Sequence, residues 1–352
     1  MGQSAINSPP MRAVALRKYL PIDDPESLVD VELPAPVPGP SDLRVRVEAV
    51  SVNPVDTKVR APKPKVEEPP RVLGWDAAGT VDAVGGAVTA FRPGDRVYYA
   101  GSIGRPGSNA ELHLVDHRIA APMPTSLDFA DAAALPLTSL TAWEGLFDRL
   151  RLGPAGGHAG RSLLLIGGAG GVGSMVIQLA KVAGLFVIAT ASRPETRAWV
   201  ESLGADAVVD HRQGLRPQIE ALGRKHVDAI YNAQNTDAWW EVMADLIAPQ
   251  GGIVGIVEAS KALDLSLLKN KSASFAWEFM FTRAAYETAD MAAQGDILRR
   301  VAGLVDAGKV RSTRRETLAP ISASNLREAH RKSESGKTIG KIVLVGWDAL
   351  RG

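Results

Sequence analysis

The stretch that decides the fold is Leu163-Leu164-Leu165-Ile166-Gly167-Gly168-Ala169-Gly170-Gly171-Val172-Gly173-Ser174-Met175-Val176-Ile177-Gln178-Leu179-Ala180. It begins as an apolar run, which predicts a buried strand, and continues through glycines into a helical pattern. Gly168, Gly170 and Gly173 have the spacing G-x-G-x-x-G. Between a strand and a helix, such glycines permit a tight turn and bring the backbone close to a pyrophosphate, which the helix N-terminus attracts. The stretch therefore predicts a dinucleotide-binding turn rather than a turn that binds nothing.

Strand-like and helix-like segments alternate after this turn. Strands are expected at residues 185–191, 207–210, 227–232 and 252–257, with helices at 194–203, 215–222 and 239–247. This alternation is typical of βαβ units in a parallel, doubly wound sheet. The fold class is therefore expected to be α/β.

The first part of the chain has a different pattern, with short strand-like runs at residues 11–16, 43–50, 77–85 and 96–99. Short strands separated by frequent turns predict a small barrel-like β domain. Strand-like runs return at 314–320 and 340–345, so the doubly wound domain is expected to be inserted into the β domain. The predicted division is a disordered leader over 1–10, a β domain over 11–137, a cofactor domain over 138–312, and a return to the β domain over 313–352.

Composition limits the classes of function. The 352 residues include 40 Lys and Arg against 39 Asp and Glu, which gives a formal net charge of +1. This balance argues against a nucleic-acid partner held through its phosphates. Cysteine is absent, so a disulfide framework, a thiolate nucleophile and a cysteine zinc site are excluded. The apolar tract over 174–191 changes from helical to strand character, so no membrane span is expected. We expect a cytoplasmic protein.

Five motifs occur in the order found in a known family: residues 51–56 (SVNPVD), 74–79 (GWDAAG), 93–97 (PGDRV), 140–143 (LTAW) and 336–344 (GKTIGKIVL). Together with the glycine turn, they resemble the medium-chain dehydrogenase/reductase superfamily, and within it the zinc-free quinone oxidoreductase branch. The resemblance covers almost the whole chain from Met11 onward. It implies a GroES-like catalytic domain, a Rossmann domain and a homodimer. Relatives near this branch often carry the label zinc-type alcohol dehydrogenase-like.

The resemblance also bears on zinc. It places the first zinc-ligand position at Asn53 and the usual His-Glu pair at Trp75-Asp76. Catalytic zinc takes three protein ligands from His, Cys or carboxylate. His113 and His117 are four residues apart in a strand-like run, which separates them by roughly 13 Å, and we expect them to be surface polar residues. No zinc is therefore expected.

The tip of the second strand of the doubly wound domain indicates the nicotinamide cofactor. An NAD-specific fold places Asp or Glu there to hold the ribose 2′-hydroxyl. This chain has Ser192 and Arg193 instead. A hydroxyl and a guanidinium suit a 2′-phosphate, so the sequence predicts NADP. Alternatively, Arg193 is a solvated loop residue.

The expected reaction is hydride transfer from NADPH to a small quinone or α,β-unsaturated carbonyl, because such an acceptor needs mainly a hydrogen bond at oxygen. By family position, Asn53 would donate that bond, Asp56 would orient Asn53 or relay a proton, and Trp75 would narrow the pocket. Two alternatives stay open: a zinc-type alcohol dehydrogenase, and an NADPH-binding protein with little turnover. The predicted catalytic residues are Asn53, Asp56, Trp75 and Tyr99, and the predicted cofactor-binding residues are Thr141, Gly168, Gly170, Gly171, Val172, Gly173, Ser192, Arg193, Gly255, Phe281 and Lys341.

Overall fold

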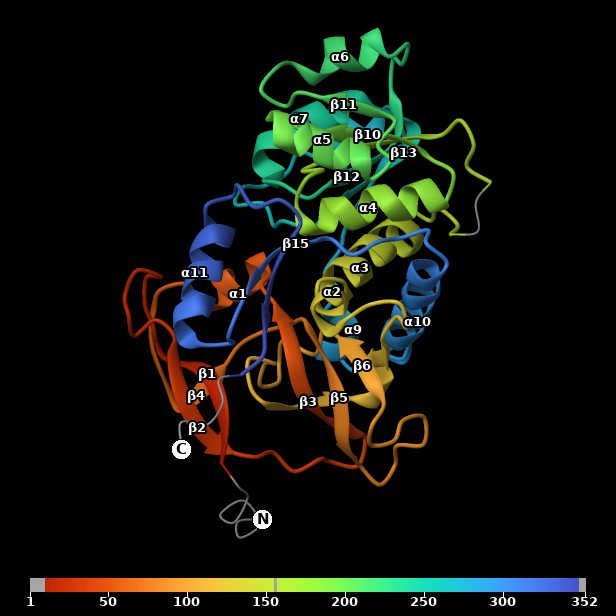
Figure 1. Cartoon of the computed structure of the whole chain (residues 1–352). Helices are drawn as coiled ribbons and strands as arrows, with labels where there is room; N and C mark the ends of the chain where they lie inside the picture. Colours follow the sequence, from red (N-terminus) through yellow and green to blue (C-terminus); the bar gives the residue numbers. More distant parts are fainter. Residues whose placement is uncertain (1–9, 155–156, 348–352) are drawn as a thin grey trace. The chain divides into compact units, whose positions relative to one another are not determined.

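The computed structural model describes residues 10–154 and 157–347. Except for Pro10, the predicted leader lies outside the described residues. Pro10 begins strand β1. Contacts divide the chain into two compact units, which are treated separately below: unit 1 comprises 1–137 and 281–352, and unit 2 comprises 138–280. Figure 1 shows the elements of both units coloured along the chain.

Unit 1 contains two sheets. Strands β2 (Val29–Pro34), β1 (Pro10–Tyr19) and β4 (Lys63–Val72) form the smaller one, which is antiparallel. The larger sheet has the order β15-β16-β3-β5-β6-β8, with β7 paired to β3. Its strands are β3 (Asp42–Ser51), β5 (Ala77–Val84), β6 (Arg96–Tyr99), β7 (Leu112–Asp116), β8 (Ala120–Pro122), β15 (Arg314–Leu318) and β16 (Lys341–Val345).

Alternation of side chains fixes the register of β3. Leu43, Val45 and Val47 are buried, whereas Arg44 and Arg46 point outward and pair with Asp82. Successive residues of a strand point to opposite faces, so a slip of one residue would expose the apolar set. Because the C-terminal strand β16 pairs antiparallel with β3, the two distant parts of the chain share one sheet.

The helices of unit 1 are α1 (Pro54–Arg60), the 3-10 turn η1 (His117–Ile119), α2 (Phe129–Ala133), the start of α3 (Pro136–Trp143), α9 (Thr282–Ala285), α10 (Ala293–Asp306) and α11 (Ala323–Glu334). Residues 281–312, which the sequence assigns to the cofactor domain, are grouped with unit 1 in the structure. The reason is the packing of α10 on β8 and η1. A Cβ at Gly295 of α10 would lie 2.5 Å from the carbonyl oxygen of Arg118, so the helix can approach η1 this closely only with glycine there.

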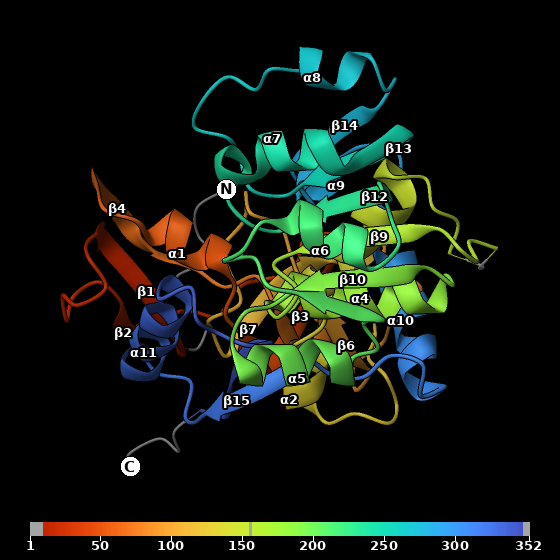
Figure 2. The same cartoon turned by 90° about the horizontal axis from the view of Figure 1, so that it is seen from above.

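Unit 2 is a doubly wound, fully parallel sheet with the strand order β11-β10-β9-β12-β13-β14 (Figure 2). This order confirms the predicted α/β class. The strands are β9 (Ser162–Ile166), β10 (Phe186–Thr190), β11 (Ala207–Val209), β12 (Val227–Asn232), β13 (Ile247–Gly255) and β14 (Ser274–Trp277), and the helices are α4 (Gly171–Val182), α5 (Pro194–Ser202), α6 (Leu215–Ala221), α7 (Thr236–Leu246) and α8 (Ser266–Lys269). The direction of winding reverses between β9 and β12, and folds of this kind bind ligands outside the carboxyl ends of the strands at that point.

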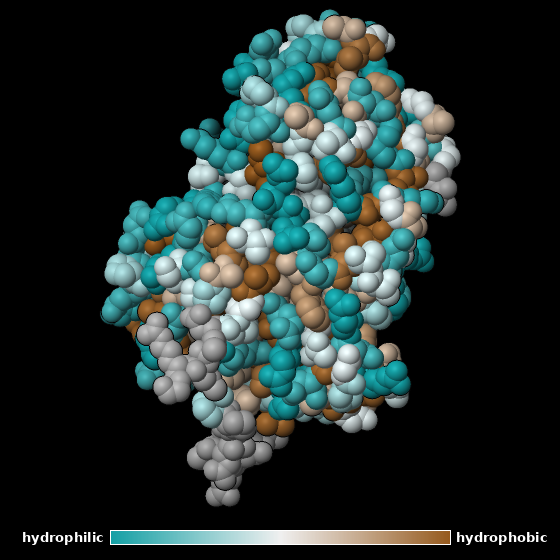
Figure 3. All heavy atoms as spheres, in the orientation of Figure 1, coloured by the Kyte–Doolittle hydropathy of each residue, from teal (hydrophilic) through white to brown (hydrophobic). Residues whose placement is uncertain are grey.

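One predicted helix, over 139–150, is two segments in the structure. Helix α3 ends at Trp143, and a π-helical segment, η2 (Glu144–Arg149), follows. Gly145 lies in this segment against the ring of Tyr231, and a Cβ there would be 2.5 Å from that ring. The wider turn of a π-helix accompanies this close contact. Among the described residues, no helix combines the length and apolar character needed to cross a membrane. Hydrophilic side chains mixed with scattered apolar ones cover the face shown in Figure 3.

Candidate active site and dinucleotide site

A buried polar cluster lies in unit 1 where three elements meet. Asn53 caps the N-terminus of α1, Asp76 precedes β5, and Lys341 begins β16. One oxygen of Asp76, Oδ2, accepts hydrogen bonds from Asn53 Nδ2 at 2.8 Å and from Lys341 Nζ at 3.1 Å. The other, Oδ1, accepts from the Leu137 N–H at 2.8 Å. Each member of the cluster is at most 3% exposed, and a buried carboxylate requires such partners.

Lys341 uses all three of its ammonium hydrogens inside this cluster. Besides Asp76, it donates to the carbonyl oxygen of Val52 at 2.8 Å and to Asn53 Oδ1. Burial lowers the pKa of Lys341, and the charge of Asp76 opposes that shift. An ammonium has three donors and no more. The structure therefore does not place Lys341 as the cofactor contact that the sequence predicts, because its donors are already committed within unit 1.

Asn53 is likewise directed into the cluster. Its amide nitrogen donates to Asp76, and its amide oxygen accepts from Lys341. The predicted role was to donate to the oxygen of an acceptor. In the structure the amide connects the carboxylate and the ammonium, and its role as a donor to the acceptor stays a prediction.

Asp56 is the member of the predicted catalytic set with a weakly hydrogen-bonded oxygen. It is the third residue of α1, and its Oδ2 accepts from the backbone N–H of Asn53 at 2.6 Å, which caps the helix. Its Oδ1 is buried without a hydrogen bond of good geometry among the described residues, and the backbone N–H of Gly74 lies near enough to lower the pKa of the carboxyl group. Burial raises the pKa of Asp56 to about 7. This carboxyl group can therefore hold a proton near neutral pH.

Tyr99 lies in the interior of unit 1. Its hydroxyl is 3.0 Å from His113 Nδ1, and the two rings stack with centroids 5.4 Å apart. His113 Nε2 is 2.9 Å from the carbonyl oxygen of Pro106, so Nε2 carries the hydrogen and the tyrosine donates to Nδ1. Burial raises the pKa of Tyr99 and lowers that of His113 to about 4. The prediction of a surface His113 is wrong, whereas the role of Tyr99 at a reacting group stays a prediction, with its hydroxyl bonded to His113 in this structure.

Trp75 and Phe281, predicted to shape the pocket and the nicotinamide wall, contact each other in unit 1. Their rings meet edge to face with centroids 6.1 Å apart, and both are almost fully buried. The indole N–H of Trp75 donates to the carbonyl oxygen of Ser102 at 3.1 Å. This bond fixes the indole, so the tryptophan has a defined orientation.

The glycine turn in unit 2 has the geometry that the motif predicts. β9 ends at Ile166, α4 begins at Gly171, and Gly167 has a φ of +90°. A Cβ at Gly173 would lie 2.3 Å from the carbonyl oxygen of Gly167, whereas at Gly170 the nearest atom would be 3.7 Å away. Gly173 is thus required for close packing, whereas a Cβ at Gly170 would make only an ordinary van der Waals contact. A side chain on the neighbouring strand, Thr190, fixes the turn by accepting from the Gly167 N–H at 2.9 Å.

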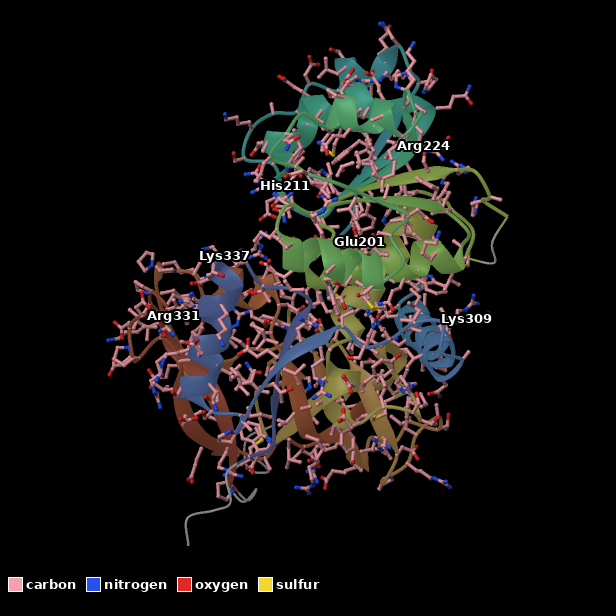
Figure 4. All side chains as sticks on the ribbon, turned by 45° about the horizontal axis from the view of Figure 1, so that its top comes forward. Glu201, His211, Arg224, Lys309, Arg331 and Lys337 are labelled. Carbon is pink, nitrogen blue, oxygen red and sulfur yellow. The ribbon has the colours of Figure 1, made fainter. Side chains whose placement is uncertain are left out.

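Basic residues gather at the carboxyl ends of β10 and β11. Arg193 caps the N-terminus of α5, and its side chain pairs with Glu195 at 3.2 Å. Arg212 donates to the carbonyl oxygen of Ser192 at 2.9 Å and forms an ion pair with Asp210 at 2.7 Å. The sequence prediction included Ser192 and Arg193 but not Arg212, which follows a different strand. Figure 4 labels His211, which precedes Arg212 in the same loop, and Lys337, an exposed residue after α11.

Two further predicted contacts lie in unit 2. The carbonyl oxygen of Thr141, on α3, accepts from the Tyr231 hydroxyl at 2.8 Å. Gly255 ends β13, and a Cβ there would lie 3.2 Å from the rings of Phe275 and Trp277. Thr141 is therefore bonded to Tyr231 of β12, and Gly255 packs against Phe275 and Trp277 of β14.

The residues present do not fit a zinc ion. Across the described ranges, no three His, Cys, Asp or Glu side chains are grouped so that they could hold a metal. The positions that the resemblance assigns to ligands carry an amide at Asn53 and an indole at Trp75, while Asp76 is occupied by Lys341. By contrast, the glycine turn leads into the N-terminus of α4, which has no side-chain cap, and such a helix start fits a dinucleotide pyrophosphate.

Comparison with known proteins gives relatives with different names, among them zinc-type alcohol dehydrogenase-like proteins and quinone oxidoreductases. Residues 39–125 match the alcohol dehydrogenase GroES-like domain, and residues 203–344 match the zinc-binding dehydrogenase family. A zinc-type alcohol dehydrogenase-like protein of Staphylococcus aureus (strain Mu50 / ATCC 700699) is 41% identical over 95% of this chain and 99% of its own length. The quinone oxidoreductase of Pseudomonas aeruginosa is 31% identical over 88% and 92%. A solved structure of Escherichia coli quinone oxidoreductase complexed with NADPH has a TM-score of 0.78 at 25% identity, covering 95% of this chain and all of the other.

Proposed function

Because this chain belongs to the medium-chain dehydrogenase/reductase superfamily of oxidoreductases, we propose that it transfers hydride from NADPH to a quinone or an α,β-unsaturated carbonyl without zinc. The observation that carries this proposal is the tip of β10. It holds Ser192 and Arg193 and has no carboxylate over residues 190–193. A carboxylate there would favour NAD, whereas a guanidinium favours a 2′-phosphate.

Residues of unit 2 would hold the dinucleotide. The backbone at Gly168, Gly170, Gly171, Val172 and Gly173 would bind the pyrophosphate, because the first N–H groups of a helix lack intrahelical acceptors and lie at its positive end. Thr141 and Gly255 remain proposed contacts of the nicotinamide half. When bound, this cofactor supplies the hydride.

Arg193 and Arg212 would share the 2′-phosphate. Each guanidinium is now paired with a carboxylate, Glu195 and Asp210 respectively. These pairs are partly exposed, and exposed ion pairs contribute little. A dianionic phosphate would therefore compete for the same guanidinium groups at low cost.

Asp56 would hold the proton that completes the reduction. Two-electron reduction of a quinone or an enone adds one hydride and one proton, so the site needs a group that is protonated near neutral pH. Asp56 has that property because of its burial, and its Oδ1 is only weakly hydrogen-bonded among the described residues. Asn53, Trp75 and Phe281 would shape the surroundings of the acceptor from unit 1.

Some relatives have names that support a quinone or an α,β-unsaturated carbonyl as the acceptor, and others do not. One relative, from Solanum lycopersicum, is a 2-methylene-furan-3-one reductase, 32% identical over 85% of this chain and 70% of its own length. Other relatives are named for zinc and alcohol. We favour the reductase because the zinc-ligand positions carry Asn53 and Trp75 and because Asp76 is paired with an ammonium. A homodimer in the cytoplasm remains part of the proposal.

The test is NADPH oxidation at 340 nm against a panel of benzoquinones, naphthoquinones and enals, with NADH in parallel. We expect turnover with at least one acceptor and a preference for NADPH of roughly ten- to a hundredfold in kcat/KM. Equal kcat/KM for the two cofactors would overturn the NADP assignment. Tight NADPH binding without turnover of any acceptor would favour the alternative of a cofactor-binding protein.

A further inference from the structure

Two of the three positions at which the family resemblance places the zinc-ligand motif, Asn53 and Asp76, are bonded to a lysine in this chain. Asn53 and Asp76 each direct one side-chain oxygen at the Nζ atom of Lys341. The carbonyl oxygen of Val52, next to Asn53, is the third acceptor. Three oxygens from two chain segments thus surround one positive charge.

The buried carboxylate of Asp76 requires the positive charge of Lys341 beside it. Asp76 is fully buried, and an isolated carboxylate in such a place is strongly disfavoured. Its remaining hydrogen bonds come from neutral N–H groups of Asn53 and Leu137. Lys341 is the cation in contact with it. The pair is buried on both sides, at 3% and 0% side-chain exposure, so solvent does not weaken it.

We propose that the ammonium of Lys341 is a built-in cation, which satisfies the buried oxygens of Asp76 and Asn53 and leaves them no room for a metal ion. It neutralises Asp76 and orients the Asn53 amide, so it is a positioning residue. A metal ion would have to displace the ammonium, because the two positive charges would compete for the same Asp76 and Asn53 oxygens.

Lys341→Met and Asp76→Asn, each alone and both together, test the role of the charge. Lys341→Met keeps most of the apolar stem and removes the cation, so it leaves Asp76 unpaired. Because breaking a buried pair is strongly destabilising, we expect Tm to fall by about 6 °C or more. Adding Asp76→Asn to Lys341→Met removes the unpaired charge, and we expect more than half of the lost Tm to return.

A chemical rescue distinguishes the charge from the packing. Lys341→Ala leaves space for a small alkylammonium ion, whereas Lys341→Met fills it. Propylammonium chloride should raise the Tm of the Lys341→Ala variant by about 3 °C at tenfold its Kd. Potassium chloride at the same ionic strength should not, and neither the wild type nor the Lys341→Met variant should respond to the amine.

The zinc content of the wild-type protein provides a further test, which needs no variant. The wild-type chain is incubated with zinc sulfate, desalted and analysed for metal by mass spectrometry, and less than about 0.1 zinc per chain is expected because Lys341 holds the oxygens. One retained zinc per chain would overturn the proposal. It would also be overturned if the effects of Lys341→Met and Asp76→Asn were additive, or if the amine gave no rescue. Because these readouts are stability and metal content, they are independent of whether NADPH reduces any acceptor.

Discussion

Replacing Asp56 with Asn changes how stability depends on pH. The ordinary pKa of the aspartate is 3.8, and burial in the folded chain raises it to about 7. The folded state therefore binds this proton more tightly than the unfolded state. Its contribution to stability is fully present below pH 3.8 and is lost as the pH rises through 7. Each pKa unit corresponds to about 1.4 kcal/mol, so the free energy of unfolding falls by about 2–3 kcal/mol between pH 5 and pH 8.

The Asp56→Asn variant removes this titration and keeps the helix cap. Its amide oxygen can still accept from the Asn53 N–H, which the carboxylate now does at 2.6 Å. We therefore expect the unfolding free energy of the variant to be nearly flat over pH 5–8, whereas that of the wild type falls. In thermal unfolding, the difference in Tm between the two proteins should change by about 5 °C over this range.

Urea unfolding followed by circular dichroism, at half-unit pH steps, measures the effect. Asp306→Asn is the matched control, because hydrogen bonds from Ser126 and Thr125 lower the pKa of Asp306 to about 2. That group is ionised in both states throughout pH 5–8, so its substitution should shift the curve without changing its slope. Parallel curves for the wild type and Asp56→Asn would refute the reasoning, since they would show that Asp56 does not hold a proton in the folded protein at neutral pH.

Three further predictions concern the two units separately. Arg193→Ala should raise the KM for NADPH about tenfold and leave the KM for NADH within about twofold, as measured by initial rates, because only NADPH carries the 2′-phosphate. Gly173→Ala should lower Tm by several degrees, because its Cβ would lie 2.3 Å from a carbonyl oxygen. In Gly170→Ala the nearest atom would be 3.7 Å from the Cβ. This variant should keep the wild-type Tm but raise the Kd of NADPH. Tyr99→Phe should lower the free energy of unfolding in urea by about 1–3 kcal/mol, because it leaves a buried ring nitrogen of His113 unpaired. Its kcat/KM should be unchanged. A large loss of kcat without a loss of stability would indicate instead that Tyr99 acts on the reacting groups.

Much of the fold could be predicted because its signals are local. The apolar run before the glycine turn gives β9, and the turn gives the start of α4 at Gly171. The alternation in β3 is equally clear, because one face is buried and the other carries Arg44 and Arg46. Strand β4, with the sequence KPKVEEPPRV, was not predicted. Its prolines and charges are unfavourable in a strand interior, and its pairing with β1 comes from tertiary structure.

The candidate site was predictable only in part, because its contacts join distant parts of the chain. Asn53, Asp56 and Lys341 were named from the sequence, but the bond from Lys341 to Asp76 links residues that no local pattern connects. Arg212 was missed because the usual signal lies after the second strand, whereas this arginine follows the third. Burial of His113 was missed because a histidine between two leucines gives no sign of the Tyr99 hydroxyl that satisfies it.

The position of β16 has a consequence for the order in which the chain folds during synthesis. Unit 2 is one continuous segment and can fold as soon as it leaves the ribosome, since domains generally fold as units. The larger sheet of unit 1 is completed later, because β16, which pairs with β3, and β15, which pairs with β16, are made after the whole of unit 2. Until Lys341 emerges, Asp76 lacks its cation and residues 49–51 of β3 lack their partner strand β16, whereas β7 already pairs with residues 42–46. Such an unpaired stretch is a template for pairing with other chains. A nascent or truncated chain that ends before residue 341 should therefore have a complete second unit but an incomplete larger sheet, with Asp76 buried beside no cation.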